Sequence, residues 1–260
     1  MPSFLARMHQ PEPENKCPDC LSIKLEGIPV QQENSDRFEF WHLSTQTHQI
    51  DLHLTIHFNE QWEPLKQGRV KFGLKGGELR LKLEHCELPF ESRELAGSFA
   101  LGIQTERQEP EASKKTTGIE GGIRATTSAL DGSKTKTLFN GNPKTDFNKT
   151  EAFQVSVCHV TPKVSEENPA WIFEEERGDP VLKGVLRQET LGTLNAIDLP
   201  CRVEATFEVS QRDVCLTDAE GLWPPDISRN KRAVLARLII QRLLAPKFKP
   251  YLSRAELHYD

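Results

Sequence analysis

The sequence predicts a mainly β protein with two similar antiparallel β-sandwich-like units, one C-terminal α-helix and a final strand. Three observations support this prediction. Apolar and polar residues alternate in many short stretches, as they do in half-buried strands. Two blocks, Asn59–Pro89 and Asn168–Pro200, resemble each other. One stretch near the C-terminus, Arg229–Leu244, has the periodicity of a helix instead.

The two blocks share three features at matching places. Each opens with Asn-x-x-Trp, continues with Val-x-x-Gly and an apolar residue, and closes with an acidic residue, leucine and proline. We interpret the two tryptophans, Trp62 and Trp171, as core anchors of the two units. Because valine, glycine and leucine recur freely in β sequences, internal duplication and coincidence both remain open as interpretations.

Changes in composition divide the chain into five parts. We expect an N-terminal arm, a first β unit, a flexible polar insertion, a second β unit and a C-terminal helix–strand cap, over residues 1–35, 36–103, 104–151, 152–217 and 218–260. The insertion is dense in Thr, Lys, Gly, Ser and Asn. It has too few large apolar residues to offset the entropy lost on ordering.

Within the first unit, the clearest strand is Ile50–Phe58, where every second residue is apolar. Arg69–Leu74 and Glu78–Glu84 are also strand-like, and the intervening Lys75-Gly76-Gly77 predicts that they form a hairpin. The remaining predicted strands are Ala96–Ile103, Ala152–Val160, Ala170–Glu175, Val181–Arg187, Thr190–Ile197 and Arg202–Val209, with Gln211–Thr217 as an edge strand.

The C-terminal helix is expected to begin after Ser228, which can cap it, and to end before Pro246. Apolar residues occupy most of its circumference, so it needs cover on two sides. It either fills a gap beside the final segment Tyr251–Tyr259 or leaves an apolar stripe for another chain. The candidate partner-binding residues are Val234, Leu238, Ile240 and Leu244.

Charge is unevenly distributed along the chain. The net charge is −5, but residues 227–260 carry +6 and the preceding 226 residues carry −11. A basic end can bind nucleic acid, and the candidate residues are Arg229, Lys231, Arg232, Lys247 and Lys249, with Trp223 or Tyr251 for base stacking. We favour solvated surface charge instead, because the bases are scattered and the acidic β body can itself attract them.

Two sets of residues have the chemistry of metal ligands. Cys17-Pro-Asp-Cys20 has the spacing of a zinc or redox pair, but no second such motif occurs to complete a site. Asp51 and His53 lie two residues apart on a predicted strand, where His159 from another strand could join them. Unpartnered thiols and the polar face of a strand are the simpler interpretations. We expect no cofactor, although zinc or another transition metal remains open.

No apolar run approaches the roughly 20 residues of a membrane span. Together with the expectation that the six cysteines remain reduced, this predicts a soluble, cytoplasmic protein without membrane association. Nucleophile-elbow, phosphate-loop and dinucleotide-binding motifs are missing from the sequence. By elimination we expect a scaffold that binds a protein partner or itself through a sheet edge or the C-terminal helix, rather than an enzyme. A metal-dependent β-fold enzyme and a nucleic-acid-binding protein are the alternatives.

Overall fold

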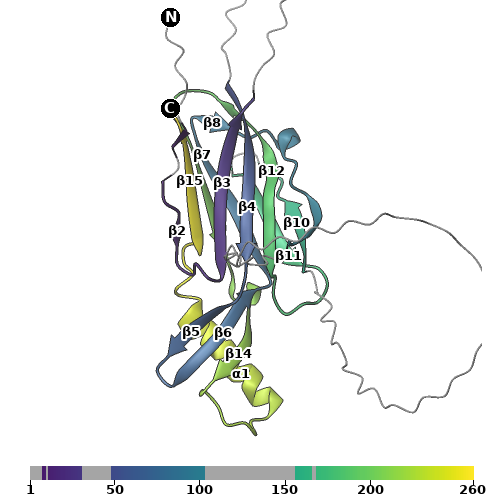
Figure 1. The fold of residues 1–260 in the computed structure, drawn as a ribbon, viewed down its shortest axis with the longest axis vertical. Helices are drawn as coiled ribbons and strands as arrows, with labels where there is room; N and C mark the ends of the chain where they lie inside the picture. The colour runs from purple at the N-terminus through teal and green to yellow at the C-terminus, as the bar shows by residue number, and fades with distance from the viewer. Residues whose placement is uncertain (1–7, 10, 31–47, 103–155, 166–167) are drawn as a thin grey trace, which may run out of the picture. The chain divides into compact units, whose positions relative to one another are not determined.

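The computed structural model describes residues 8–9, 11–30, 48–102, 156–165 and 168–260 (Figure 1). The described strands form three antiparallel sheets. One C-terminal α-helix follows most of the strands, and a final strand follows the helix. The predicted mainly β class, helix and final strand are therefore confirmed. The predicted insertion at 104–151 lies outside the described residues.

Sheet A is the largest of the three, with eight strands. In spatial order they are β1 (Met8–His9), β15 (Ser253–Tyr259), β13 (Cys201–Glu208), β7 (Gly76–Glu84), β11 (Ala170–Glu175), β10 (Val157–Pro162) and β9 (Gly97–Ala100), while β2 (Glu14–Asn15) also pairs with β15.

Sheet B has four strands in the order β3 (Leu21–Pro29), β4 (His48–Phe58), β12 (Gly184–Ala196) and β8 (Cys86–Glu87). The predicted strand Ile50–Phe58 is confirmed as β4, and its apolar residues all point into the core. The two predicted strands between Val181 and Ile197 are in fact one strand, β12, with two register shifts against β4. Gly192 at the second shift has φ +151° and lies so close to the backbone of Ser92 that a Cβ would lie 2.4 Å from its carbonyl oxygen.

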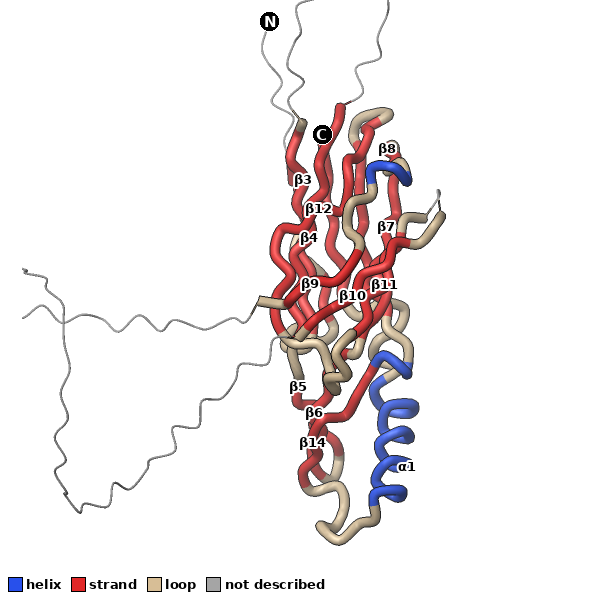
Figure 2. Tube along the Cα trace, turned by 90° about the vertical axis from the view of Figure 1, so that its right-hand side faces the viewer, coloured by secondary structure: helices blue, strands red, loops and turns tan. Residues whose placement is uncertain are grey.

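Sheet C contains β14 (Val214–Glu220), β6 (Gly68–Leu74) and β5 (Gln61–Leu65). The described helical segments are the short 3₁₀ turns Phe90–Ser92 and Gln211–Asp213, the helix α1 (Arg229–Ile239) and a π turn at Ile240–Leu244. Figure 2 shows α1 running alongside β14. The edge strand predicted at 211–217 corresponds to β14, which lies at the end of its sheet.

Sheets A and B pack face to face around one apolar core (Figures 1 and 2). Phe58 of β4 contacts Phe173 of β11 and Phe207 of β13, with ring centroids 6.2 and 5.9 Å away. The rings of Phe173 and Phe207 are 5.7 Å apart, and all three side chains are buried. This aromatic cluster joins the two sheets at the end of β4 where Phe58 pairs with Leu21 of β3 and Gly184 of β12.

The two predicted β units do not form separate sheets. Strands from residues 36–103 and from residues 152–217 occur together in each of the three sheets. Trp171 is buried in sheet A, whereas Trp62 lies half-buried in sheet C beneath the guanidinium of Arg69, whose Cζ is 4.4 Å from the ring centroid. Trp62 is therefore not a core anchor, and duplication of the two blocks stays a prediction.

Lys75-Gly76-Gly77 does not close a hairpin. The chain crosses here from β6 in sheet C to β7 in sheet A, and these two strands do not pair with each other. A Cβ on Gly76 would lie 2.1 Å from the carbonyl oxygen of Phe173, and one on Gly77 would lie 2.3 Å from the ring of Phe207. The two glycines permit close packing between strands and do not form a turn. The predicted hairpin is therefore wrong.

The predicted N-terminal arm also contributes to the body in its described part. β3 pairs along its whole length with β4, from Leu21 opposite Phe58 to Pro29 opposite Ile50. Leu21, Ile23 and Leu25 alternate into the core. Burial of these three side chains explains why this segment is ordered despite its polar surroundings in the sequence.

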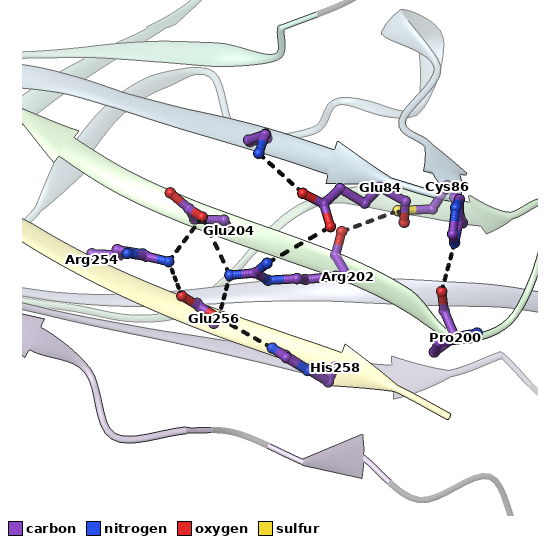
Figure 3. Close-up of polar contacts among 10 residues, drawn as sticks. Glu84, Cys86, Pro200, Arg202, Glu204, Arg254, Glu256 and His258 are labelled. Atoms are coloured by element: carbon purple, nitrogen blue, oxygen red, sulfur yellow. Dashed lines mark hydrogen bonds and ion pairs between the residues drawn. The ribbon is translucent and has the colours of Figure 1, made fainter.

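The outer face of sheet A carries a network of ion pairs (Figure 3). Arg202 lies 2.8 Å from Glu256, 3.6 Å from Glu204 and 3.7 Å from Glu84, measured from guanidinium nitrogen to carboxylate oxygen. Arg254 contacts Glu204 at 3.1 Å and also Glu256. The network keeps this broad face charged and hydrated, so an apolar contact surface has to be sought elsewhere.

Candidate functional site

Helix α1 begins as predicted, because the hydroxyl oxygen of Ser228 accepts a hydrogen bond from the backbone N–H of Lys231. None of its eleven residues is buried. Three large apolar side chains on the helix are exposed, namely Val234 by 59%, Leu235 by 38% and Leu238 by 37%. These residues form what we call the outer stripe, on the side of α1 turned away from β14.

The other two candidate partner residues belong to the body. Leu244 in the π turn is buried, and Ile240 is half-buried against the core. Beyond the turn, Phe248 is buried and its ring centroid lies 5.6 Å from that of Phe72 in β6. The C-terminal end of the helix is therefore anchored to sheet C, while the outer stripe is left uncovered by the described residues.

Two adjoining hollows separate α1 from β14, with volumes of about 440 and 590 Å³. Ala233 and Ala236 line both of them. The first hollow also touches Leu216, Thr217, Asp218, Ala219, Trp223, Arg229 and Arg232, and the second touches Lys75, Gln211, Arg212, Val214, Cys215, Leu216, Arg237 and Ile240. We call the two together the α1–β14 groove.

Glu60, in the link between β4 and β5, connects sheet C to the segment that precedes β12. Its side chain is 8% exposed and contacts the ammonium nitrogens of Lys183 at 2.6 Å and Lys71 at 3.1 Å. Burial alone would raise the pKa of this carboxyl, but hydrogen bonds from Lys183, Thr217 and Lys71 outweigh it and hold the pKa below its ordinary value. Thr217 lies in β14, so Glu60 also fixes one wall of the groove.

We expect Glu60→Gln to lower the free energy of unfolding by about 1–3 kcal/mol at pH 7, because the two lysines lose their nearly buried counter-ion. The lowered pKa means that the charge stabilises the fold above the unfolded value of about 4.5. That contribution disappears as the pH falls through the lower folded value. Urea unfolding of both proteins from pH 7 to pH 3 should show the deficit shrinking.

The control for this substitution is Glu220→Gln. Glu220 pairs with Arg69 at 2.7 Å, but both side chains are about half exposed, so its loss should be much smaller. A Glu60→Gln deficit that is equal to that of the control, or that does not change with pH, would contradict the assigned role.

The five candidate nucleic-acid residues are not one continuous basic surface. Arg229 and Arg232 line the groove, Lys231 is exposed on the helix, and Lys249 lines a separate hollow with Arg212. Lys247 forms an ion pair with Glu63 of β5.

The two aromatic residues proposed for base stacking already have contacts. The Arg232 guanidinium lies 5.9 Å from the ring centroid of Trp223. Lys16 lies over the ring of Tyr251 at 4.7 Å, and the Tyr251 hydroxyl donates to Glu14 at 2.7 Å. Nucleic-acid binding stays a prediction, with fewer free groups than the sequence indicates.

The candidate metal ligands are not brought together. Asp51 and His53 lie on the outer face of β4 in sheet B, where Asp51 accepts a hydrogen bond from Thr193 at 2.7 Å. His159 lies on the outer face of β10 in sheet A, with its Nδ1 3.0 Å from the hydroxyl oxygen of Ser98. The core separates the two positions, and within the described residues no group of three or more His, Cys, Asp or Glu is placed to hold a metal ion.

Cys17 and Cys20 form a buried turn that leads into β3. The carboxamide oxygen of Asn15 accepts from the N–H of Cys17 at 3.0 Å, and the N–H of Cys20 donates to the carbonyl of Cys17 at 3.0 Å. Burial raises the pKa of the Cys17 thiol to about 11 and also raises that of Cys20. Both thiols are thus held in the protonated form, which is a poor nucleophile.

Sequence reasoning missed the groove because its signal is weak. Arg229, Arg232, Ala233 and Ala236 follow helical spacing and share one side of α1. The other residues of the helix mostly have large side chains. Two alanines on its inward side indicate unfilled space only once it is known that β14 lies opposite them.

The sequence matches no protein-family model and none of the curated proteins with which it was compared. In the described part of the chain, no helix has the length and hydrophobicity needed to cross a bilayer. The choice among functions therefore depends on the geometry of the surface.

Proposed function

We propose that this chain is a non-catalytic protein-binding or assembly protein, and that its contact surface is the outer stripe of α1 together with the free edge of β14. One observation supports this most strongly: α1 has no buried residue, yet carries Val234, Leu235 and Leu238 exposed on one side. Fully burying a large aliphatic side chain contributes about 1.5–3 kcal/mol. Covering the stripe with a partner would therefore favour association.

The anchoring of the helix supports the same proposal. Leu244 and Phe248 fix its C-terminal end in the core, and the Ser228 cap stabilises its first turn. The outer stripe therefore lies on a helix that is already ordered. The free energy of binding is then not reduced by the entropy that would be lost if the helix had to fold on binding. In contrast, the broad outer face of sheet A carries paired charges.

The test is the double variant Val234→Asp/Leu238→Asp in the full chain. Sedimentation velocity over a range of concentrations reports self-association, and cross-linking in extract of the native cells reports other partners. We expect complexes of the wild-type chain to be lost in the variant, because two charges would have to be buried at the contact.

Ile197→Asp is the matched control, since Ile197 is 67% exposed but lies in the loop between β12 and β13. It should leave the complexes unchanged. If the folded double variant retains every complex, or the wild-type chain forms none by either method, the proposal is wrong.

A further inference from the structure

The α1–β14 groove exists because the helix turns its smallest residues toward the strand. Ala233 and Ala236 lie on the side of α1 that faces β14, opposite the outer stripe. Longer side chains at these two positions would fill the space between the helix and the strand. The π turn packs into the core immediately afterwards through Leu244. The C-terminal end of the helix is thus held in the core, and the helix runs beside β14 (Figure 2). The two hollows lie between the helix and the strand.

The strand side of the groove is an edge of sheet C. Consecutive residues line both hollows, Leu216 to Ala219 in one and Val214 to Leu216 in the other. A strand face would present alternate residues instead. Among the described residues, β14 pairs with β6 alone. Outside that pairing, the N–H of Ala219 donates to the carboxylate of Asp218, and no other backbone N–H of β14 donates to a described residue. β14 has a register shift against β6 between Leu216 and Asp218, so its regular edge consists of one segment on each side of this shift. A free edge can accept another strand.

The groove is also basic. Among the described residues that line it, Asp218 is the one carboxylate and five residues carry a positive charge, namely Lys75, Arg212, Arg229, Arg232 and Arg237. Four of them form no ion pair with the described residues, and Arg212 contacts the neighbouring Asp213 only at 3.9 Å. An occupant with negative side chains would therefore complement the groove.

We propose that the α1–β14 groove binds an extended acidic segment of a protein partner, which adds to β14 as a further strand of sheet C. The segment's backbone pairs with the edge of β14, its acidic side chains contact the arginines of α1, and its small apolar side chains contact Leu216, Ala233 and Ala236. This inference rests on the proposed protein-binding function and names the chemistry of the partner.

An extended peptide fits the groove better than a nucleic acid does. A strand edge offers alternating N–H donors and carbonyl acceptors, which a peptide backbone matches, whereas phosphate oxygens only accept. Trp223, the aromatic residue in the groove, is already covered by Arg232.

The probe is a fluorescent peptide of alternating valine and glutamate, with the seven-residue length of β14. Its affinity for the full chain is measured by anisotropy, next to a valine–lysine peptide and a valine–glutamate peptide with a methylated backbone. We expect the first peptide to bind and the other two to bind at least about tenfold more weakly, since one lacks charge complementarity and the other lacks backbone donors. Hydrogen exchange should become slower in β14 when the first peptide is bound.

Two variants test the location of binding. Ala236→Phe fills the groove without changing charge and should abolish peptide binding. Arg232→Glu/Arg237→Glu should weaken it by roughly fivefold or more, because each lost exposed pair contributes up to about 1 kcal/mol. The control Arg187→Glu reverses an exposed charge on β12 in sheet B and should have no effect.

Equal binding of the acidic and basic peptides, or full binding to Ala236→Phe, would overturn the inference. Tighter binding of a single-stranded oligonucleotide than of the acidic peptide, lost in Arg232→Glu/Arg237→Glu, would also overturn it in favour of nucleic acid. The groove proposal can fail while the protein-binding function holds. In that case the acidic peptide does not bind, but complexes that are lost in Val234→Asp/Leu238→Asp still form in the wild-type chain and in Ala236→Phe.

Discussion

Phe207→Ala is expected to lower the free energy of unfolding by about 3–5 kcal/mol, the usual range for removing a fully buried phenylalanine. Phe207 of sheet A contacts Phe58 of sheet B and Phe173 of its own sheet, with ring centroids within 6 Å. Its removal leaves a cavity where the two sheets meet. Both the lost burial and the lost aromatic contacts therefore contribute.

Urea unfolding measured by tryptophan fluorescence would give this loss. Leu199→Ala is the control, because Leu199 is 41% exposed and its truncation should change stability by no more than about 0.5 kcal/mol. Similar losses in the two variants would mean that Phe207 does not lie at the junction of the sheets.

Gly77→Ala is expected to cost about 1–3 kcal/mol or more, although it adds a single methyl group. The new Cβ would lie 2.3 Å from Cε1 of Phe207 and 2.9 Å from the carbonyl oxygen of Glu208. Strand β7 pairs with both β13 and β11, so the clash cannot be relieved by moving one edge strand. The unfolding free energy of Gly77→Ala should fall well below that of the wild type.

Gly102→Ala is the matched substitution, since a Cβ there would lie 3.5 Å from the carbonyl oxygen of Val185, an ordinary contact. Phe207→Leu offers a second check. The smaller leucine side chain makes room for the methyl group, so the two changes together should cost less than their sum. Strict additivity would contradict the contact between Gly77 and Phe207.

Those parts of the fold that depend on local pattern were predictable. Strict alternation located β4 and β13, and the Ser228 cap and helical period located α1, because each element must turn one set of side chains to the core. The pairing of strands was not predictable in the same way. β6 and β7 are neighbours in sequence but lie in different sheets, since Gly76 and Gly77 serve close packing instead of a turn.

The candidate surface shows the same division. The sequence by itself determined that the C-terminal helix is apolar around most of its circumference, because composition and period are local properties. Only the tertiary structure decided that Leu244 is buried, that Val234 and Leu238 are exposed, and that Ala233 and Ala236 leave a groove beside β14. Which side of a helix meets the core depends on contacts between residues far apart in the chain, and periodicity alone carries no information about them.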